Sequence, residues 1–179
     1  NQTNLGLTKS LNKALREAKG KHIARLDDKD IAHKKRLQLQ VEFLESHPTY
    51  ALVGTWAYEM NTEGIIVGKR KLPCESSQLK RALIHYNPFF HSSLMIKMEA
   101  FERVGLYNEE WRRAQDYELY FRIAKFYDIA NLPEYLTNYR FAADSITRTK
   151  NREQAFFALK ARQKALKEGL YPKGLQALL

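Results

Sequence analysis

The chain has 179 residues, of which 44% are hydrophobic and 28% charged, as expected for one globular domain with a sizeable core. Ten Tyr, nine Phe and two Trp residues carry more apolar area than disordered segments do, which excludes a disordered chain. The formal net charge is +10, from 30 Lys and Arg against 20 Asp and Glu. This charge favours an anionic partner such as a phosphate, a nucleotide, a nucleic acid or an acidic lipid.

Cysteine and membrane signals are few. Cys74 is the only cysteine, which excludes a disulfide framework, and the five histidines lack the paired spacing of a zinc site. The longest apolar run without a charge, residues 50–58, is far shorter than the roughly 18 residues of a membrane helix. These features predict a reducing, cytoplasmic location.

Periodic apolar residues and turn residues predict alternating helices and strands, and therefore a mixed α/β fold. The first half is predicted to contain a helix at 7–18, a strand at 21–26, a helix at 37–48 and a hairpin of strands 50–58 and 65–69. The second half is predicted to contain a helix at 76–85, a strand at 93–97, helices at 99–104 and from 116, strands at 129–132 and 135–140, and a basic helix at 151–169. The expected apolar faces include Leu37, Val41 and Leu44 in the second helix and Phe156, Leu159 and Leu166 in the last.

Three carboxylates, those of Asp27, Asp28 and Asp30, follow the first predicted strand. Such a cluster suits Mg²⁺ or Mn²⁺ held between the protein and a diphosphate. The alternative is a solvated acidic turn in which Asp30 is the N-cap of the next helix.

Asp116 is predicted to lie at the start of an amphipathic helix, where the free N–H groups and the helix dipole favour the ionised carboxylate. In a cleft, this group is a candidate general base. A helix-capping role is the alternative.

Two further segments carry polar candidates. His91 and Ser92 lie in a loop that leads into a strand, where His91 is either functional or a satisfied core histidine. Arg140 ends a predicted strand and could pair with a phosphate or simply be solvated.

Taken in order, these pieces strongly resemble the family-2 glycosyltransferases. The segments that carry the resemblance are residues 4–7, 18–27, 37–48, 53–55, 87–95, 104–107, 114–119 and 131–140. The resemblance implies a partial GT-A fold, in which a nucleotide-binding α/β sheet adjoins an acceptor-binding half. It also implies inverting transfer of a sugar, of the hexosyltransferase type, from a nucleotide-diphosphate donor, with a UDP-sugar favoured, to a glycan or a lipid-linked acceptor.

The resemblance also assigns residues. Asp27 would be the first aspartate of the family's D-x-D motif, near the ribose or the metal, and Arg25 would lie near the nucleotide. Asp116 would be the catalytic base. His91 and Ser92 would line the acceptor side, to which we also assign Arg140.

The chain departs from the family at the metal site. Lys29 occupies the place of the second D-x-D aspartate, Gln115 replaces an acidic residue that often precedes the base, and Ala142 replaces a histidine. Mg²⁺ or Mn²⁺ is expected from the family, with Asp27 and Asp30 as candidate ligands. Lys29 leaves three alternatives: its ammonium replaces the metal, metal binding and activity are impaired, or Asp28 and Asp30 hold the metal.

The resemblance further implies a preceding segment with the first strands of the nucleotide-binding sheet. Without it a parallel sheet has an unpaired edge and an uncovered face. We therefore expect residues 1–147 to be the C-terminal portion of a GT-A domain that a missing N-terminal half or an oligomer partner completes, followed by a basic amphipathic helix and tail at 148–179.

The C-terminal segment is strongly basic. Residues 148–179 contain eight Lys and Arg against two Glu, a net charge of +6. An amphipathic basic helix suits an anionic membrane surface, here the inner face of the cytoplasmic membrane, although a solvated helix face is the alternative. No nucleic-acid-binding module accompanies it, so nucleic acid is not expected as a partner. A non-catalytic binding module remains the alternative function.

Overall fold

The computed structural model describes residues 3–141 and 151–169. Its described helices are α1 (Leu7–Glu17), α2 (Arg36–Ser46), α3 (Ser76–His85), α4 (Met98–Val104), α5 (Gln115–Phe126) and α7 (Asn151–Lys167), with a 3-10 turn η1 (His91–Ser93). Its described strands are β1 (His22–Ala24), β2 (Ile31–Ala32), β3 (Tyr50–Met60), β4 (Ile66–Arg70), β5 (Met95–Lys97) and β6 (Asp128–Arg140). The mixed α/β fold class is confirmed.

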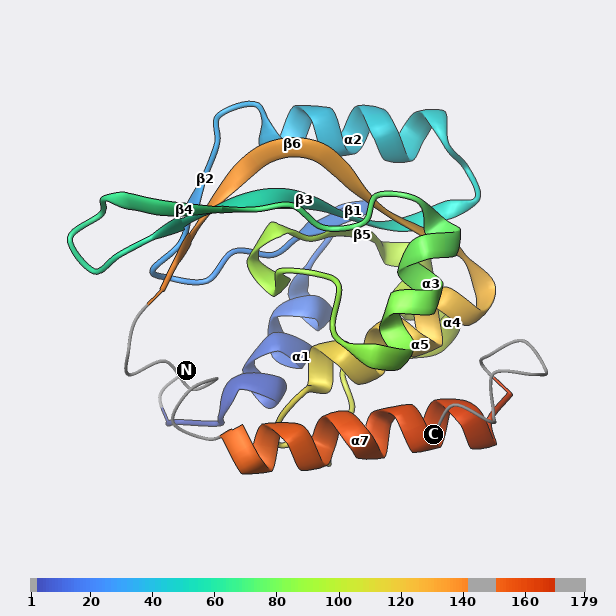
Figure 1. The fold of residues 1–179 in the computed structure, drawn as a ribbon. Helices are drawn as coiled ribbons and strands as arrows, with labels where there is room; N and C mark the ends of the chain where they lie inside the picture. Colours follow the sequence, from blue (N-terminus) through green and yellow to red (C-terminus); the bar gives the residue numbers. More distant parts are fainter. Residues whose placement is uncertain (1–2, 142–150, 170–179) are drawn as a thin grey trace.

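One mixed sheet organises the chain (Figure 1). Its strand order is β1-β5-β3-β6-β2, and β4 pairs with the end of β3 that β5 leaves free. β3 and β6 are parallel, and every other pairing is antiparallel. The short strand β2, which the sequence analysis did not predict, forms because Ile31 and Ala32 pair with the end of β6.

The strand β6 corrects one prediction. The sequence predicted two strands separated by Pro133, whereas the structure has one continuous strand. Its register against β3 shifts where Thr55 pairs with Leu132 and Trp56 pairs with Tyr135. Proline lacks the N–H that a ladder needs, and the irregularity accommodates it without ending the strand.

Helices cover both faces of the sheet (Figure 1). α2 covers one face, over a small core that contains Leu44 and Val53. The other helices lie on the opposite side and share a larger core with the sheet. No helix among the described residues is long and apolar enough to cross a membrane.

One predicted helix face is wrong in part. In α2 Leu44 is buried as predicted, but the other buried residues are Arg36 and Gln40, and Leu37 is 52% exposed. In α7 Phe156 and Leu159, which the sequence places on one side of the helix, are both exposed. The prediction of Asp30 as a helix N-cap is also wrong, because the chain enters β2 directly after it and α2 begins only at Arg36.

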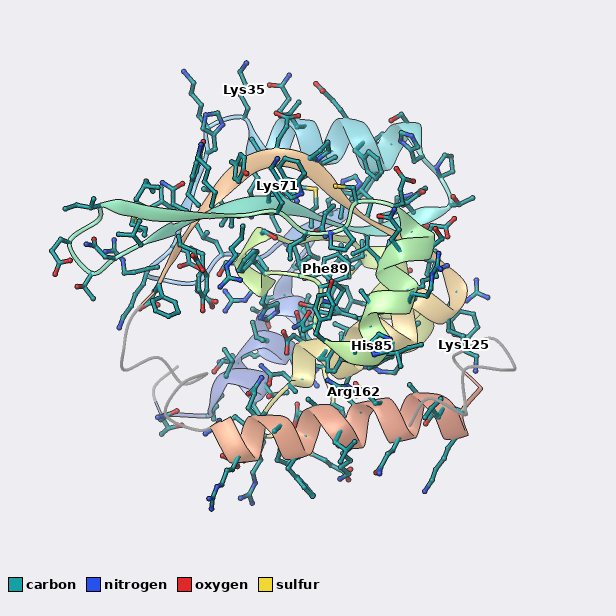
Figure 2. The ribbon with its side chains drawn as sticks, in the orientation of Figure 1. Lys35, Lys71, His85, Phe89, Lys125 and Arg162 are labelled. Atoms are coloured by element: carbon teal, nitrogen blue, oxygen red, sulfur yellow. The ribbon has the colours of Figure 1, made fainter. Side chains whose placement is uncertain are left out.

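α7 is fastened to the larger core. Ala161 and Ala165 are 1% exposed and, being small, allow α7 to approach α5 closely. The ammonium of Lys164 lies 2.6 Å from the buried carboxylate of Glu118. Arg162 reaches from α7 toward α3, where it donates a 2.7 Å hydrogen bond to the carbonyl of His85 (Figure 2).

Some predicted features lie outside the described residues. They are Ala142, the proposed boundary at residue 147 and the tail after residue 169.

Candidate functional site

The acidic loop after β1 is ordered by contacts of Asp27. The guanidinium of Arg25 pairs with Asp27 Oδ1. The Ser92 hydroxyl donates to Asp27 Oδ2 at 2.8 Å and accepts the Asp27 backbone N–H at 3.2 Å. Arg25 and Asp27 of one segment and Ser92 of another therefore form one cluster.

Asp30 lies beside this cluster and is 8% exposed. Its Oδ1 accepts the backbone N–H of Arg140 at 2.7 Å, whereas its Oδ2 is buried without a hydrogen-bond partner among the described residues. Burial, together with the negative charge of Asp27, raises the pKa of Asp30 above its ordinary value. The carboxyl group thus holds the chain to β6 at the cost of desolvation.

Two buried polar residues of α2, which the sequence analysis missed, bind backbone carbonyls of the cluster and of the neighbouring strands. Arg36 donates to the carbonyls of Ser92 at 2.6 Å and Arg25 at 2.8 Å. Gln40 donates to the carbonyls of Val53 at 3.0 Å and Ser93 at 2.8 Å. The sequence signal was the spacing of Arg36, Gln40 and Leu44, which places all three on one helix face.

His91 is held by a second set of hydrogen bonds. Its Nε2 lies 2.8 Å from the Tyr107 hydroxyl. The backbone N–H and C=O of Tyr107 are bound by the side-chain amide of Asn12, at 3.0 and 2.8 Å. Burial lowers the pKa of His91, although the charge of Asp116 acts against this shift. A neutral imidazole at this position can accept or donate one hydrogen bond.

Asp116 lies in the first turn of α5, as predicted for a carboxylate at a helix start. The Asn87 side-chain amide donates to Asp116 Oδ2 at 3.0 Å, and its oxygen accepts the Phe89 N–H at 3.1 Å. The preceding Ala114 has a left-handed conformation, with φ 51°. A non-glycine residue there is strained, which marks the turn that sets the start of α5.

The acidic loop and the helix start meet around His91 and Tyr107. The charges of Arg25, Asp27 and Asp116 all act on the pKa of His91, and burial with the charge of Asp116 raises the pKa of Tyr107. Interactions of this kind require proximity. The structure therefore brings together the predicted donor-side, acceptor-side and base residues in one neighbourhood.

Three other predicted site residues, Asp28, Lys29 and Arg140, do not join the cluster around His91. The side chains of Asp28 and Lys29 are exposed and make no hydrogen bond or ion pair with the described part of the chain. Arg140 donates from its guanidinium to the carbonyls of Lys29, Asn61 and Thr62, at 2.7–2.9 Å. These contacts tie the acidic loop to the β3–β4 turn.

The residues present do not fit a divalent ion in this arrangement. Among the described residues no group of three or more His, Cys, Asp or Glu side chains could hold a metal ion. Asp27 is already paired with a guanidinium, and of the Asp30 carboxylate only the buried Oδ2 lacks a hydrogen-bond partner among the described residues. One or two carboxylates can hold Mg²⁺ together with water and substrate phosphates, but they must be free to face them, and neither Asp27 nor Asp30 is free in this way.

Two solved structures have a similar fold. The mannosyltransferase PcManGT from Pyrobaculum calidifontis, solved with GDP-Man and Mn²⁺, matches 96% of this chain and 47% of its own, with a TM-score of 0.65 and 21% identity. S. aureus TarS in complex with UDP-GlcNAc matches 78% of this chain and 40% of its own, with a TM-score of 0.59 and 17% identity. The GT-A-like fold is thereby confirmed.

Curated relatives point the same way. A glycosyltransferase of Methanocaldococcus jannaschii is 34% identical over 78% of this chain and 49% of its own length. The amylovoran biosynthesis glycosyltransferase AmsE of Erwinia amylovora is 30% identical over 82% of this chain and 55% of its own. The chain thus spans about half the length of these relatives. The model of glycosyl transferase family 2 matches residues 1–105, and with these relatives it shows that the chain belongs to that family.

Proposed function

We propose that the protein transfers a sugar, as a hexosyl group, from a nucleotide-diphosphate donor to a glycan or lipid-linked acceptor with inversion, and that Asp116 is the catalytic base. The observation that carries the proposal is the hydrogen bond from Asn87 to Asp116 Oδ2, at 3.0 Å, close to His91 and the Asp27 cluster. Asn87 leaves the other carboxylate oxygen of Asp116 free of described hydrogen bonds.

In this mechanism Asp116 accepts the proton of the acceptor hydroxyl as its oxygen attacks the anomeric carbon. The bond from that carbon to the diphosphate oxygen breaks on the opposite side, and the nucleoside diphosphate leaves with the electron pair. Asn87 fixes the rotamer of Asp116 and keeps the base aimed at one place. His91 and Ser92 line the acceptor side.

The donor side is assigned to the loop that carries Arg25, Asp27 and Lys29. The pairing of Asp27 with Arg25 orients the guanidinium at the loop. The exposed ammonium of Lys29 would neutralise the leaving diphosphate as a fixed cation, in the place where the family resemblance implies a metal ligand. Arg140 would act through the position of Lys29, whose carbonyl it binds.

The relatives support the substrate classes. TarS and PcManGT were solved with UDP-GlcNAc and GDP-Man, which favours a nucleotide sugar as donor, and we retain a UDP-sugar as the first choice. AmsE is named for amylovoran biosynthesis, which favours a polysaccharide product. A cytoplasmic reaction agrees with the single cysteine Cys74.

The test is Asp116→Asn, assayed by nucleoside-diphosphate release from UDP- and GDP-sugars with glycan and lipid-linked acceptors. Loss of the base should reduce kcat by about 100-fold or more, while donor affinity, measured by calorimetry, stays within about twofold of the unaltered protein. Glu102→Gln, an exposed carboxylate on α4, is the matched control and should keep full activity.

Two outcomes would count against this assignment. Turnover retained in Asp116→Asn removes Asp116 from the role of base. Donor binding without turnover in the unaltered chain, for every donor and acceptor pair, would favour the alternative of a non-catalytic binding module.

A further inference from the structure

The outward face of α7 is apolar and basic at once. Phe156 is 61% exposed and Leu159 is 46% exposed. The other exposed residues on this side of the helix, at helical spacing, are Arg152, Lys160, Gln163 and Lys167. We call these six residues the α7 outer face.

The α7 outer face carries no negative charge. The two carboxylates between residues 151 and 169 are those of Glu153 and Glu168. Glu153 is paired with Arg113 at 3.2 Å, on the side that meets the body of the protein. Glu168 follows the helix and lies 3.9 Å from Lys164. Every charged residue of the α7 outer face is therefore a cation, and the remaining polar residue, Gln163, is neutral.

α7 cannot rotate to bury this face, because its opposite side already contacts the core of the protein. Ala161 and Ala165 are buried against the core. Lys164 binds Glu118, and Arg162 binds the Tyr117 hydroxyl at 3.1 Å as well as the carbonyl of His85. Phe156 and Leu159 therefore remain exposed in the folded protein, although exposure of two large apolar groups is unfavourable.

A shallow pocket borders the cationic edge of this face. Its volume is about 380 Å³, and it is lined by Trp111, Lys160, Gln163, Lys164, Lys167 and Glu168. The ammonium groups of Lys160 and Lys164 lie 4.6 and 5.4 Å from the centre of the Trp111 ring. Trp111 is 4% exposed and Lys164 is paired with Glu118, which leaves Lys160 and Lys167 at the rim to contact a phosphate group.

We propose that the α7 outer face binds the surface of a bilayer that contains anionic phospholipid. Phe156 and Leu159 enter the boundary between headgroups and acyl chains, while Arg152, Lys160 and Lys167 contact phosphate groups. Charge complementarity selects this partner. A second copy of the chain would bring the same cations face to face across a two-fold axis, which is repulsive. This interaction does not depend on catalysis.

The test is flotation of the full chain with vesicles of pure phosphatidylcholine or of phosphatidylcholine with phosphatidylglycerol. The protein should bind the anionic vesicles at least tenfold more tightly than the neutral ones. Phe156→Ser/Leu159→Ser should weaken binding to anionic vesicles about tenfold or more. Lys160→Gln/Lys167→Gln should weaken it similarly and reduce its salt dependence.

The matched control removes as much exposed apolar surface elsewhere. Leu37 and Val67 are 52% and 61% exposed, on α2 and β4, and Leu37→Ser/Val67→Ser should bind like the unaltered protein. Circular dichroism would verify that each variant is folded.

Several results would overturn the proposal. They are equal binding to neutral vesicles, unchanged binding in Phe156→Ser/Leu159→Ser, or an equal loss in the control variant. Self-association that Phe156→Ser/Leu159→Ser abolishes, without vesicle binding, would assign the face to a second copy of the chain. Transferase activity in the absence of lipid is unaffected by any of these outcomes, so this inference and the proposed function can fail separately.

Discussion

Asp30 fixes the acidic loop to β6, but burying its carboxylate lowers the stability of the folded protein at neutral pH. Its carboxylate is nearly buried, and Oδ2 has no described partner. Because burial raises its pKa in the folded state, the folded protein binds the proton more tightly than the unfolded chain does. The contribution of Asp30 to stability is therefore complete below its ordinary pKa of 3.8 and is lost as the pH rises through the raised value.

Asp30→Asn should raise the stability of the protein at pH 7, because the amide keeps an acceptor for the Arg140 N–H and removes a buried charge. The gain should shrink as the pH falls toward 3.8. Urea denaturation at a series of pH values measures both effects. The exposed Asp28→Asn is the control and should change stability little at any pH. A variant at Asp30 that is less stable at neutral pH would show that the ionised carboxylate is stabilising here.

At the scale of elements, the parallel pair β3 and β6 depends on a close approach at Gly54. A Cβ atom there would lie 2.2 Å from Asn131 Oδ1 and 3.0 Å from the ring of Phe89. The Asn131 amide nitrogen donates to the carbonyls of Pro73 at 2.8 Å and Pro88 at 3.1 Å. Gly54 thus makes room for the side chain that holds the loop leading to Phe89 and His91.

Gly54→Ala should lower the free energy of unfolding by about 1–3 kcal/mol, because the added methyl group overpacks this contact. The partner variant Asn131→Ala should also destabilise, since it leaves two buried carbonyls without that donor. In the double variant the Cβ of residue 54 no longer meets an amide oxygen, so the combined loss should be smaller than the sum. Chemical denaturation of all four proteins gives the coupling energy. Additive losses would mean that the clash is not with Asn131.

The existence of most elements could be predicted, but the orientation of several could not. Turn residues and periodicity located α1 to α5 and β3 well. The buried face of α2 was missed because Arg36 and Gln40 satisfy backbone carbonyls of distant loops, a compensation that hydropathy does not report. β2 was missed because two residues carry no periodic signal.

Within the candidate site, the family resemblance predicted Asp27, His91, Ser92 and Asp116 from separate segments, and the structure brings these residues near one another. Their roles stay predictions. Asn87 lay within the matched motif, yet its bond to Asp116 could not be foreseen from spacing. The Tyr107 hydroxyl contacts His91, and Asn12, 95 positions before Tyr107, binds the Tyr107 backbone. This long-range contact is visible only in the three-dimensional structure.

Over the whole molecule, positive charge is unevenly placed. Eight of the 30 Lys and Arg residues lie in residues 148–179. Two others, Arg25 and Lys29, lie in a separate place, the proposed donor loop. Because this loop offers cations and few free carboxylate oxygens, donor binding should rely on fixed positive charge.

Calorimetric titration of UDP and UDP-sugars should therefore give affinities that change less than about threefold between Mn²⁺ and EDTA. Lys29→Ala should weaken binding by up to about fivefold, the range of an exposed charge pair, and this effect should fade in high salt. The exposed Lys34→Ala is the matched control. Tight binding that disappears with EDTA would contradict the fixed-cation proposal.

The last strand of the sheet also governs when the site can form. β6 closes the sheet against β3, pairs with β2 and, through the Arg140 N–H, holds Asp30, which lies 110 positions earlier in the chain. Pairings between such distant segments make folding slow, because the intervening chain loses its freedom before the contacts form. During synthesis the acidic loop therefore cannot reach the geometry described here before residue 140 has been added, because the Arg140 N–H that binds Asp30 belongs to the last strand of the described sheet.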